Sequence, residues 1–160
     1  MADLALSMPP AAAGDERFID DYLLYLLARA SHVASAQFHE RLVERGISVP
    51  VWRVLAVLAG TDGLTVGELA KGVLFKQPTL TKVVDRMAAD GLVERVPGEG
   101  DRRRVLVRST EKGRDLVAGL LVEAKEHERG ILASYTREEA HALKEVLRTL
   151  IDRSDDAGGM

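Results

Sequence analysis

The hydrophobic period of the chain changes at Gly91, and this change constrains the fold more than any other feature. Segment 76–91 has apolar residues at the three- and four-residue spacing of one helical face: Leu80, Val83, Val84 and Met87. After Gly91, segments 92–96 and 104–109 have the composition of two strands, and a glycine-rich, arginine-bearing turn joins them. The sequence therefore predicts a short helix that leads directly into a β-hairpin.

A second short helix is expected just before this one. Thr65 and Glu68 have the spacing of a capping box, in which each side chain bonds the other residue's backbone N–H. The apolar positions that follow share one helical face: Val66, Leu69, Ala70 and Val73. Leu64 is expected to add a third short strand. Two short helices separated by a tight turn and followed by a hairpin predict a winged helix-turn-helix.

The outer face of segment 76–91 is polar and basic. Pro78 suits the first helical turn, so Lys76 or Gln77 is expected at the N-cap. Short hydrogen-bonding groups near a helix N-terminus can reach base edges in a major groove, and cations further along can reach phosphates. Asp85 is expected at the rim, paired with Arg86 or with a residue of the hairpin. The candidate DNA contacts are Lys76, Gln77, Pro78, Thr79, Thr81, Lys82 and Arg86. An ordinary amphipathic surface helix is the alternative interpretation.

The charge distribution supports a basic lobe on an acidic body. The 160-residue chain has a net charge of −3. Between Lys71 and Arg114, however, eleven Lys and Arg face six Asp and Glu, so that this segment is +5 and the remainder is −8. Such an asymmetry concentrates attraction for a polyanion on one part of the molecule, as expected of a nucleic-acid-binding protein.

Long helices are expected on both sides of this lobe. Segment 16–44 reads as one helix with two apolar faces, which needs more than one packing partner. Thr110 can cap a helix over 111–134, and Thr136 with Glu139 can open a last one. The expected fold is mainly α with a small β-wing. Its divisions are a flexible arm at 1–15, dimerisation helices at 16–45 and 111–154, a winged lobe at 46–110 and a frayed tail at 155–160.

Several classes of function are disfavoured. The chain has no cysteine, which excludes disulfides and thiolate metal sites. It shows no apolar run of membrane-spanning length and no signal-peptide pattern, so we expect a cytoplasmic protein without membrane contact. We find neither a phosphate-binding loop nor a catalytic triad spacing, and expect no enzyme activity and no cofactor. Glu123 and His127 share a helical face with Glu126 and Glu128 nearby, which is more typical of a solvated surface than of a metal site.

Four segments carry a resemblance to a known family: SVPVWRVLAVL (48–58), LTVGELA (64–70), KQPTLTKVVDRMAADGLVERV (76–96) and GDRRRVLVRSTEKG (100–113). With them, the chain resembles the MarR family of bacterial transcriptional regulators over about 20–152. The last segment matches the family's wing signature, and it departs from the pattern at Ser109, where leucine is usual.

The resemblance implies a homodimer that binds a pseudo-palindromic operator in double-stranded DNA. We expect a repressor, but the sequence does not separate repressor from activator, because that depends on where the operator lies relative to a promoter. It places Asp101 as a brace of the wing and Arg103 in the minor groove, with Arg102 or Arg104 as substitutes if the register differs. It also implies a pocket for a small-molecule effector, often an aromatic carboxylate. The candidate lining residues are Tyr25, Arg29, His32, Ala36, Trp52 and Arg53.

Two alternatives remain open at this point. A winged helix can serve protein contacts alone, but acidic or apolar residues on the outer helical face would then be expected in place of Lys76, Lys82 and Arg86. A regulator of the same fold can also sense a metal, in which case Glu123 and His127 would be its candidate ligands.

Overall fold

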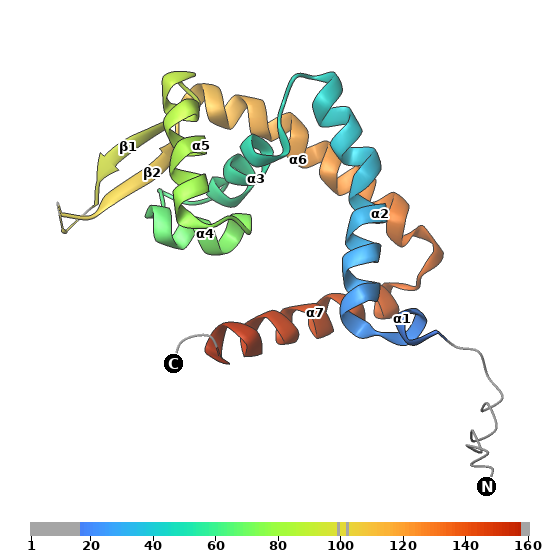
Figure 1. Ribbon diagram of the computed structural model, residues 1–160. Helices are drawn as coiled ribbons and strands as arrows, with labels where there is room; N and C mark the ends of the chain where they lie inside the picture. Colours follow the sequence, from blue (N-terminus) through green and yellow to red (C-terminus); the bar gives the residue numbers. More distant parts are fainter. Residues whose placement is uncertain (1–16, 99, 102, 158–160) are drawn as a thin grey trace, which may run out of the picture. The chain divides into compact units, whose positions relative to one another are not determined.

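The computed structural model describes residues 17–98, 100–101 and 103–157 (Figure 1). The chain divides into two compact units, residues 1–37 and 38–160, which we describe separately. The elements are α1 (Phe18–Asp21), α2 (Leu23–Glu44), α3 (Val49–Leu58), α4 (Val66–Val73), α5 (Gln77–Ala89), β1 (Val93–Pro97), β2 (Val105–Ser109), α6 (Glu111–Ile131), the 3-10 turn η1 (Leu132–Ser134) and α7 (Arg137–Ala157). Among the described residues, every helix is too short or too polar to span a lipid bilayer.

The first unit corrects the prediction of a single long helix over 16–44. The backbone is extended at Tyr22 (φ −78°, ψ 111°), and this separates α1 from α2. The rings of Phe18 and Tyr22 stack with centroids 4.9 Å apart across the break. No proline or glycine marks the position. The segment instead combines aromatic, β-branched and aspartate residues, whose helix propensities are all low. The predicted arm at 1–15 lies outside the described residues.

The second unit contains a hydrophobic core built by the helix stripes. Leu80, Val84 and Met87 of α5 are fully buried, and so are Leu69 and Val73 of α4. They pack with residues of α3, the hairpin and the start of α6: Val54, Leu55, Leu58, Leu92, Val93, Val107 and Val117. The predicted apolar faces of both short helices are confirmed, and in Figure 1 the two helices lie beside α3 and the hairpin.

The predicted helix starts are confirmed. The Ser48 hydroxyl accepts from the Val51 N–H at 3.4 Å, and Thr110 caps α6 through the Gly113 N–H at 3.1 Å. Thr65 and Glu68 form the complete capping box of α4. A second box opens α7, where the Thr136 N–H donates to Glu139 at 2.8 Å and the Glu139 N–H donates to the Thr136 hydroxyl at 3.2 Å.

The hairpin is antiparallel, and Arg95 pairs with Val107 at its centre. Its strands begin and end within one residue of the predicted limits. Leu64 contributes an isolated bridge to Val107, with N···O distances of 3.0 and 2.7 Å, rather than a full third strand. We call the segment 92–109 the wing. Its sheet is therefore joined to the residue that immediately precedes the capping box of α4.

The C-terminal helices differ slightly from the prediction. The helix expected over 111–134 ends at Ile131 and tightens into η1. The last helix continues to Ala157, past the predicted start of a frayed tail at 155. Alanine is the best helix former, and the first glycine after it is Gly158, which explains the extra length. Residues 158–160 lie outside the described part of the chain.

Ser109 has a buried hydroxyl with no hydrogen-bond partner among the described residues. The residue is only 6% exposed. Because an unpaired buried polar group costs about 1–3 kcal/mol, we expect Ser109→Ala to raise the free energy of unfolding by about 1 kcal/mol, partly offset by the lost volume. Urea denaturation measures this change. Ser134→Ala, at an exposed position, should change stability by less than about 0.5 kcal/mol; equal effects of the two variants would contradict the prediction.

Candidate nucleic-acid interface

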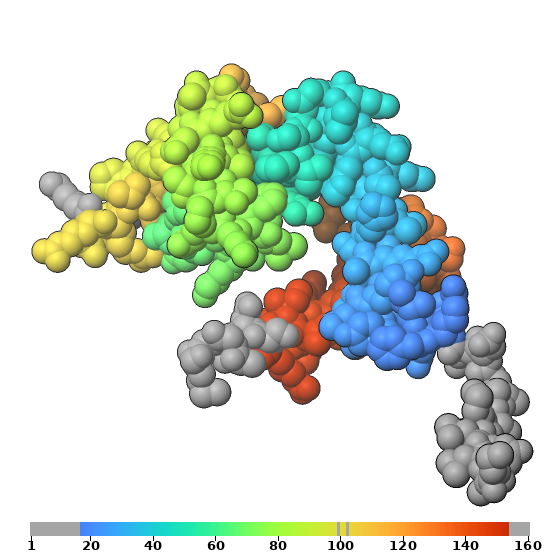
Figure 2. Space-filling view, in the orientation of Figure 1, coloured from blue at the N-terminus to red at the C-terminus, as the bar shows by residue number. Residues whose placement is uncertain are grey.

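The outer face of α5 is exposed and basic. Lys76 is its N-cap residue without a side-chain cap bond, and Pro78 lies in the first turn as predicted. Lys82 and Arg86 are exposed one turn apart and form no ion pair within the described part of the chain. Figure 2 shows α5, in light green, at the surface beside the yellow strands of the wing. The full set of exposed candidates on this face is Lys76, Gln77, Pro78, Thr79, Thr81, Lys82 and Arg86.

Two of these polar candidates are constrained by local contacts. A Cβ atom placed on Gly67 would lie 2.9 Å from the Gln77 Nε2 atom, so the glycine leaves room for the amide beside the start of α4. The Thr81 hydroxyl donates to the Gln77 carbonyl at 2.9 Å. Thr81 therefore offers a ligand mainly its acceptor lone pairs, whereas the exposed Thr79 hydroxyl has no such bond to its own helix among those described.

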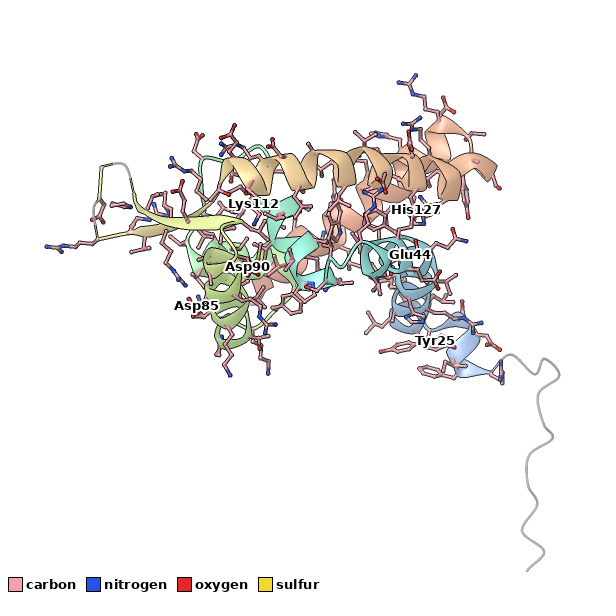
Figure 3. The ribbon with its side chains drawn as sticks, turned by 90° about the horizontal axis from the view of Figure 1, so that it is seen from above. Tyr25, Glu44, Asp85, Asp90, Lys112 and His127 are labelled. Carbon is pink, nitrogen blue, oxygen red and sulfur yellow. The ribbon has the colours of Figure 1, made fainter. Side chains whose placement is uncertain are left out.

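Asp85 is paired with the wing, as the sequence suggested. Arg95 Nη1 of β1 lies 2.7 Å from Asp85 Oδ1 (side-chain exposure 36% and 57%). Figure 3 shows Asp85 on the outer side of α5. The pair neutralises the one acidic group on this face of the helix and holds the first strand of the wing against α5. The charge of this exposed face is then positive, because Lys82 and Arg86 remain without acidic partners among the described residues.

The wing turn is held by Asp101. Its carboxylate accepts from the Arg103 N–H at 2.9 Å, and its carbonyl accepts from the Arg104 N–H at 3.0 Å. Gly100 has a φ of +84°, a conformation that favours glycine. Arg103 is exposed in this turn. Arg102 lies outside the described residues.

Arg104 is engaged with α4. Its Nη2 atom lies 2.9 Å from Glu68 Oε1. Glu68 Oε2 simultaneously accepts from the Thr65 N–H and hydroxyl at 2.8 and 2.7 Å. The hydrogen bonds from Thr65, and to a smaller degree Arg104, lower the pKa of the Glu68 carboxyl below its usual value. The capping box was readable from the sequence, but its second partner was not, because 36 residues separate Glu68 from Arg104.

The lowered pKa predicts a pH dependence. A carboxyl whose pKa falls on folding contributes stability that is complete above its ordinary pKa of 4.5 and is lost as pH falls through the lower folded value. The difference in the free energy of unfolding between the wild type and Glu68→Gln should therefore be largest near neutral pH and should decrease steadily as the pH falls below 4.5. Urea denaturation across this range measures it; a difference that does not change with pH would exclude an ionised cap.

The first turn of α6 holds the end of α5. Lys112 Nζ donates to the Asp90 carbonyl at 2.7 Å, and the Thr110 hydroxyl donates to the Gly91 carbonyl at 2.6 Å. The Thr110 N–H donates to the Leu92 carbonyl at 3.1 Å. Figure 3 shows Lys112 and Asp90 at this junction. Three consecutive carbonyls that follow α5 are thus bonded by the residues that open α6, a contact that periodicity alone did not predict.

Comparison with known proteins places this geometry in a family. Residues 45–104 match the model described as MarR family. A crystal structure of the MarR family regulator SPO1453 from Silicibacter pomeroyi DSS-3 has 44% sequence identity and a TM-score of 0.77, covering 86% of this chain and 98% of that one. The chain belongs to the MarR family. Its fold is the winged helix-turn-helix of those regulators, with α4 and α5 as the helix-turn-helix and β1–β2 as the wing.

Two further proteins similar to this chain bear on function. The HTH-type transcriptional repressor IacR of Pseudomonas putida is 39% identical over 102 residues, which are 63% of this chain and 60% of that protein. A structure of BpsR from Bordetella bronchiseptica, described as explaining regulation of its DNA binding by 6-hydroxynicotinic acid, is 25% identical with a TM-score of 0.73, covering 87% of this chain and 99% of that one. The first protein is thus named as a repressor of transcription, and the second as a DNA-binding protein whose DNA binding is regulated by a small aromatic acid.

The predicted effector residues of this MarR family chain fall in different units. Tyr25, Arg29, His32 and Ala36 belong to the first, where Arg29 Nη1 donates to the Tyr25 hydroxyl at 3.1 Å. In the second, the Trp52 ring meets Phe38 edge-on at 5.0 Å, and the Arg53 guanidinium lies 5.7 Å from the Phe75 ring. None of the six lines either of two cavities of the second unit, which have volumes of about 600 and 370 Å³ and are lined by described residues.

The acidic cluster of α6 is occupied by neighbouring side chains. Glu123 forms an ion pair with Arg45 at 2.5 Å, and Glu128 pairs with Lys144 at 2.9 Å and with Lys125 at 3.3 Å. The bond from Lys144 is the main reason why the pKa of Glu128 lies below its usual value. The His127 ring packs 5.9 Å from the Phe38 ring. Within the described residues, no three potential ligands gather as a metal site would require.

Proposed function

We propose that this chain is a homodimeric transcriptional repressor that binds a pseudo-palindromic operator in duplex DNA. The observation that carries the proposal is the exposed face of α5. It presents Lys82 and Arg86 without acidic partners, while Arg95 neutralises the single aspartate. A helix of this kind beside an arginine-bearing wing suits major-groove docking with phosphate contacts on either side.

Apolar exposure on the terminal helices supports the dimer. In the single chain, α7 exposes Val146 (66%) and Ile151 (59%), and α1–α2 exposes Phe18 (78%) and Leu23 (57%). Apolar side chains at such density on two terminal elements are typical of an interface between subunits. A second copy of the chain would cover them and would bring two α5 helices to one face of a duplex, at the spacing of two half-sites.

The proposed effector is a small aromatic acid that releases the repressor from DNA. Support comes from the regulation of BpsR by 6-hydroxynicotinic acid. It also comes from the cationic and aromatic side chains of the six predicted residues, because an arginine binds a carboxylate in a bidentate manner and an indole packs against an aromatic ring. Arg29 and His32, which both belong to the first unit, would bind the acid group.

Mobility-shift binding to the intergenic DNA beside the chain's own gene tests this function. The expected result is saturable binding at about 0.1 M salt that weakens with added salt, with a slope in log–log form of about −0.9 per phosphate neutralised. A panel of benzoate, salicylate and nicotinate derivatives should contain one acid that releases the complex. Binding that no acid releases would overturn the effector proposal, and no specific binding at low salt would favour a protein-contact role.

A further inference from the structure

The two strands of the wing are fastened to different helices of the helix-turn-helix. β1 is joined to α5 through the Arg95–Asp85 pair at 2.7 Å. The segment entering β2 is joined to α4 through the Arg104–Glu68 pair at 2.9 Å. Three residues further along, Val107 exchanges two backbone hydrogen bonds with Leu64, next to the α4 cap. The second side of the wing therefore has two attachments to one short stretch, residues 64–68.

Glu68 is itself held in place, which makes it a suitable anchor. Its Oε2 atom is fixed by the Thr65 N–H and hydroxyl, and its own N–H donates to the Thr65 hydroxyl at 3.2 Å. The other oxygen, Oε1, faces Arg104. One carboxylate thus caps the N-terminus of α4 through one oxygen and binds Arg104 of the wing through the other. Because its rotamer is determined by the cap, the position of the Arg104 guanidinium follows from the helix.

We propose that Arg104 is a positioning residue of the DNA interface, which holds the wing against the capped end of α4 so that Arg103 is presented to the duplex. This inference rests on the proposed DNA-binding function. It assigns different roles to the adjacent residues Arg103 and Arg104. The Asp101 carboxylate shapes the turn through the Arg103 N–H at 2.9 Å, and Arg104 fixes the direction in which that turn points. Among the described residues of the turn, Arg103 is the arginine left to reach DNA.

The pair acts on orientation more than on stability. Both side chains are about half exposed, at 55% and 49%, and exposed ion pairs contribute little to the free energy of folding. An ion pair can shift the equilibrium toward a correctly placed wing by no more than the free energy of the pair itself. The expected loss of DNA affinity on breaking it is therefore modest, about two- to fivefold.

The sign of the effect of Glu68→Gln distinguishes positioning from direct contact. Glutamine can serve in a capping box, so this variant keeps the start of α4 and removes the ion pair. It also removes a negative charge near the polyanion, and simple electrostatics would then give tighter binding. Positioning gives the opposite result, a two- to fivefold loss. Glu139→Gln is the matched control, because it removes the same charge from the second capping box, in α7.

A double-mutant cycle completes the test in fluorescence titrations of the full-length protein with its operator. Glu68→Gln and Arg104→Gln should each weaken binding, with the salt slope retained, and the double variant should bind no more weakly than either one. If Glu68→Gln binds as tightly as the wild type or tighter, and Arg104→Gln lowers the salt slope by about 0.9, then Arg104 contacts phosphate and the inference fails. Absence of specific binding by the wild type would instead overturn the proposed function.

Discussion

Gly113→Ala is expected to destabilise the protein by about 3 kcal/mol or more. This is the largest effect expected from adding one methyl group at any described glycine. A Cβ atom at this position would lie 2.1 Å from the Leu92 carbonyl oxygen and 3.3 Å from Leu55 Cδ2. The first contact is with backbone that cannot rotate away, since the same carbonyl accepts from the Thr110 N–H. Relief therefore requires α6 to move away from the end of α5.

A glycine elsewhere in the same helix gives the control. Gly119 is exposed, and a Cβ atom there would meet nothing within 4 Å. Gly119→Ala should accordingly raise stability by about 1 kcal/mol, the ordinary gain in helix propensity. Thermal and urea unfolding of both variants, at one protomer concentration, measures the contrast. If Gly113→Ala were as stable as Gly119→Ala, the close approach of α6 to Leu92 would be wrong.

Arg103→Ala is expected to lower operator affinity by about 10- to 100-fold and to leave stability unchanged. The side chain is exposed in the wing turn, so its removal opens no cavity. An arginine in a narrow minor groove contributes on the order of 1–3 kcal/mol and neutralises one phosphate equivalent, so the log–log salt slope should also fall by about 1. Titrations at several salt concentrations measure both quantities.

Two comparisons make the Arg103 result specific. Arg129→Ala removes an exposed arginine from α6, outside the lobe, and should change affinity less than twofold. Thr79→Ala, at the start of α5, should instead reduce discrimination between operator and mutated operator while the salt slope stays constant. An unchanged affinity and slope for Arg103→Ala would remove the wing from the interface and leave α5 as its only candidate.

Local signals in the sequence were sufficient for most element boundaries. Thr65 with Glu68, Thr136 with Glu139, and Gly91 after α5 each act within a few residues, and the structure has them as predicted. Tyr22 shows where this approach fails. The backbone there is extended without a proline or glycine. The helix propensity of this segment is low only when it is summed over several residues, so no single residue indicated the break.

Tertiary pairings were predictable only where charge left few choices. An aspartate on a basic helical face is expected to pair with a cation, and Asp85 pairs with Arg95 of the wing. No such argument led to Glu68, whose role in the capping box already explained its presence. Nor did periodicity distinguish Gly113 from Gly119, because both are simply weak helix formers until the neighbouring backbone is known. Contacts between elements distant in sequence decide such cases.

The junction between α5 and α6 makes the longer helix a lever arm. With 21 residues at 1.5 Å each, α6 is about 31 Å long, and its first turn is bonded to the carbonyls that follow α5, the helix proposed to face DNA. A tilt of only about 5° about its far end would carry that junction through about 2.7 Å. In a symmetric pair both ends would move, and successive major grooves lie about 34 Å apart on one face of a duplex. A small rearrangement far from the DNA would thus be amplified into a mismatch with the groove spacing.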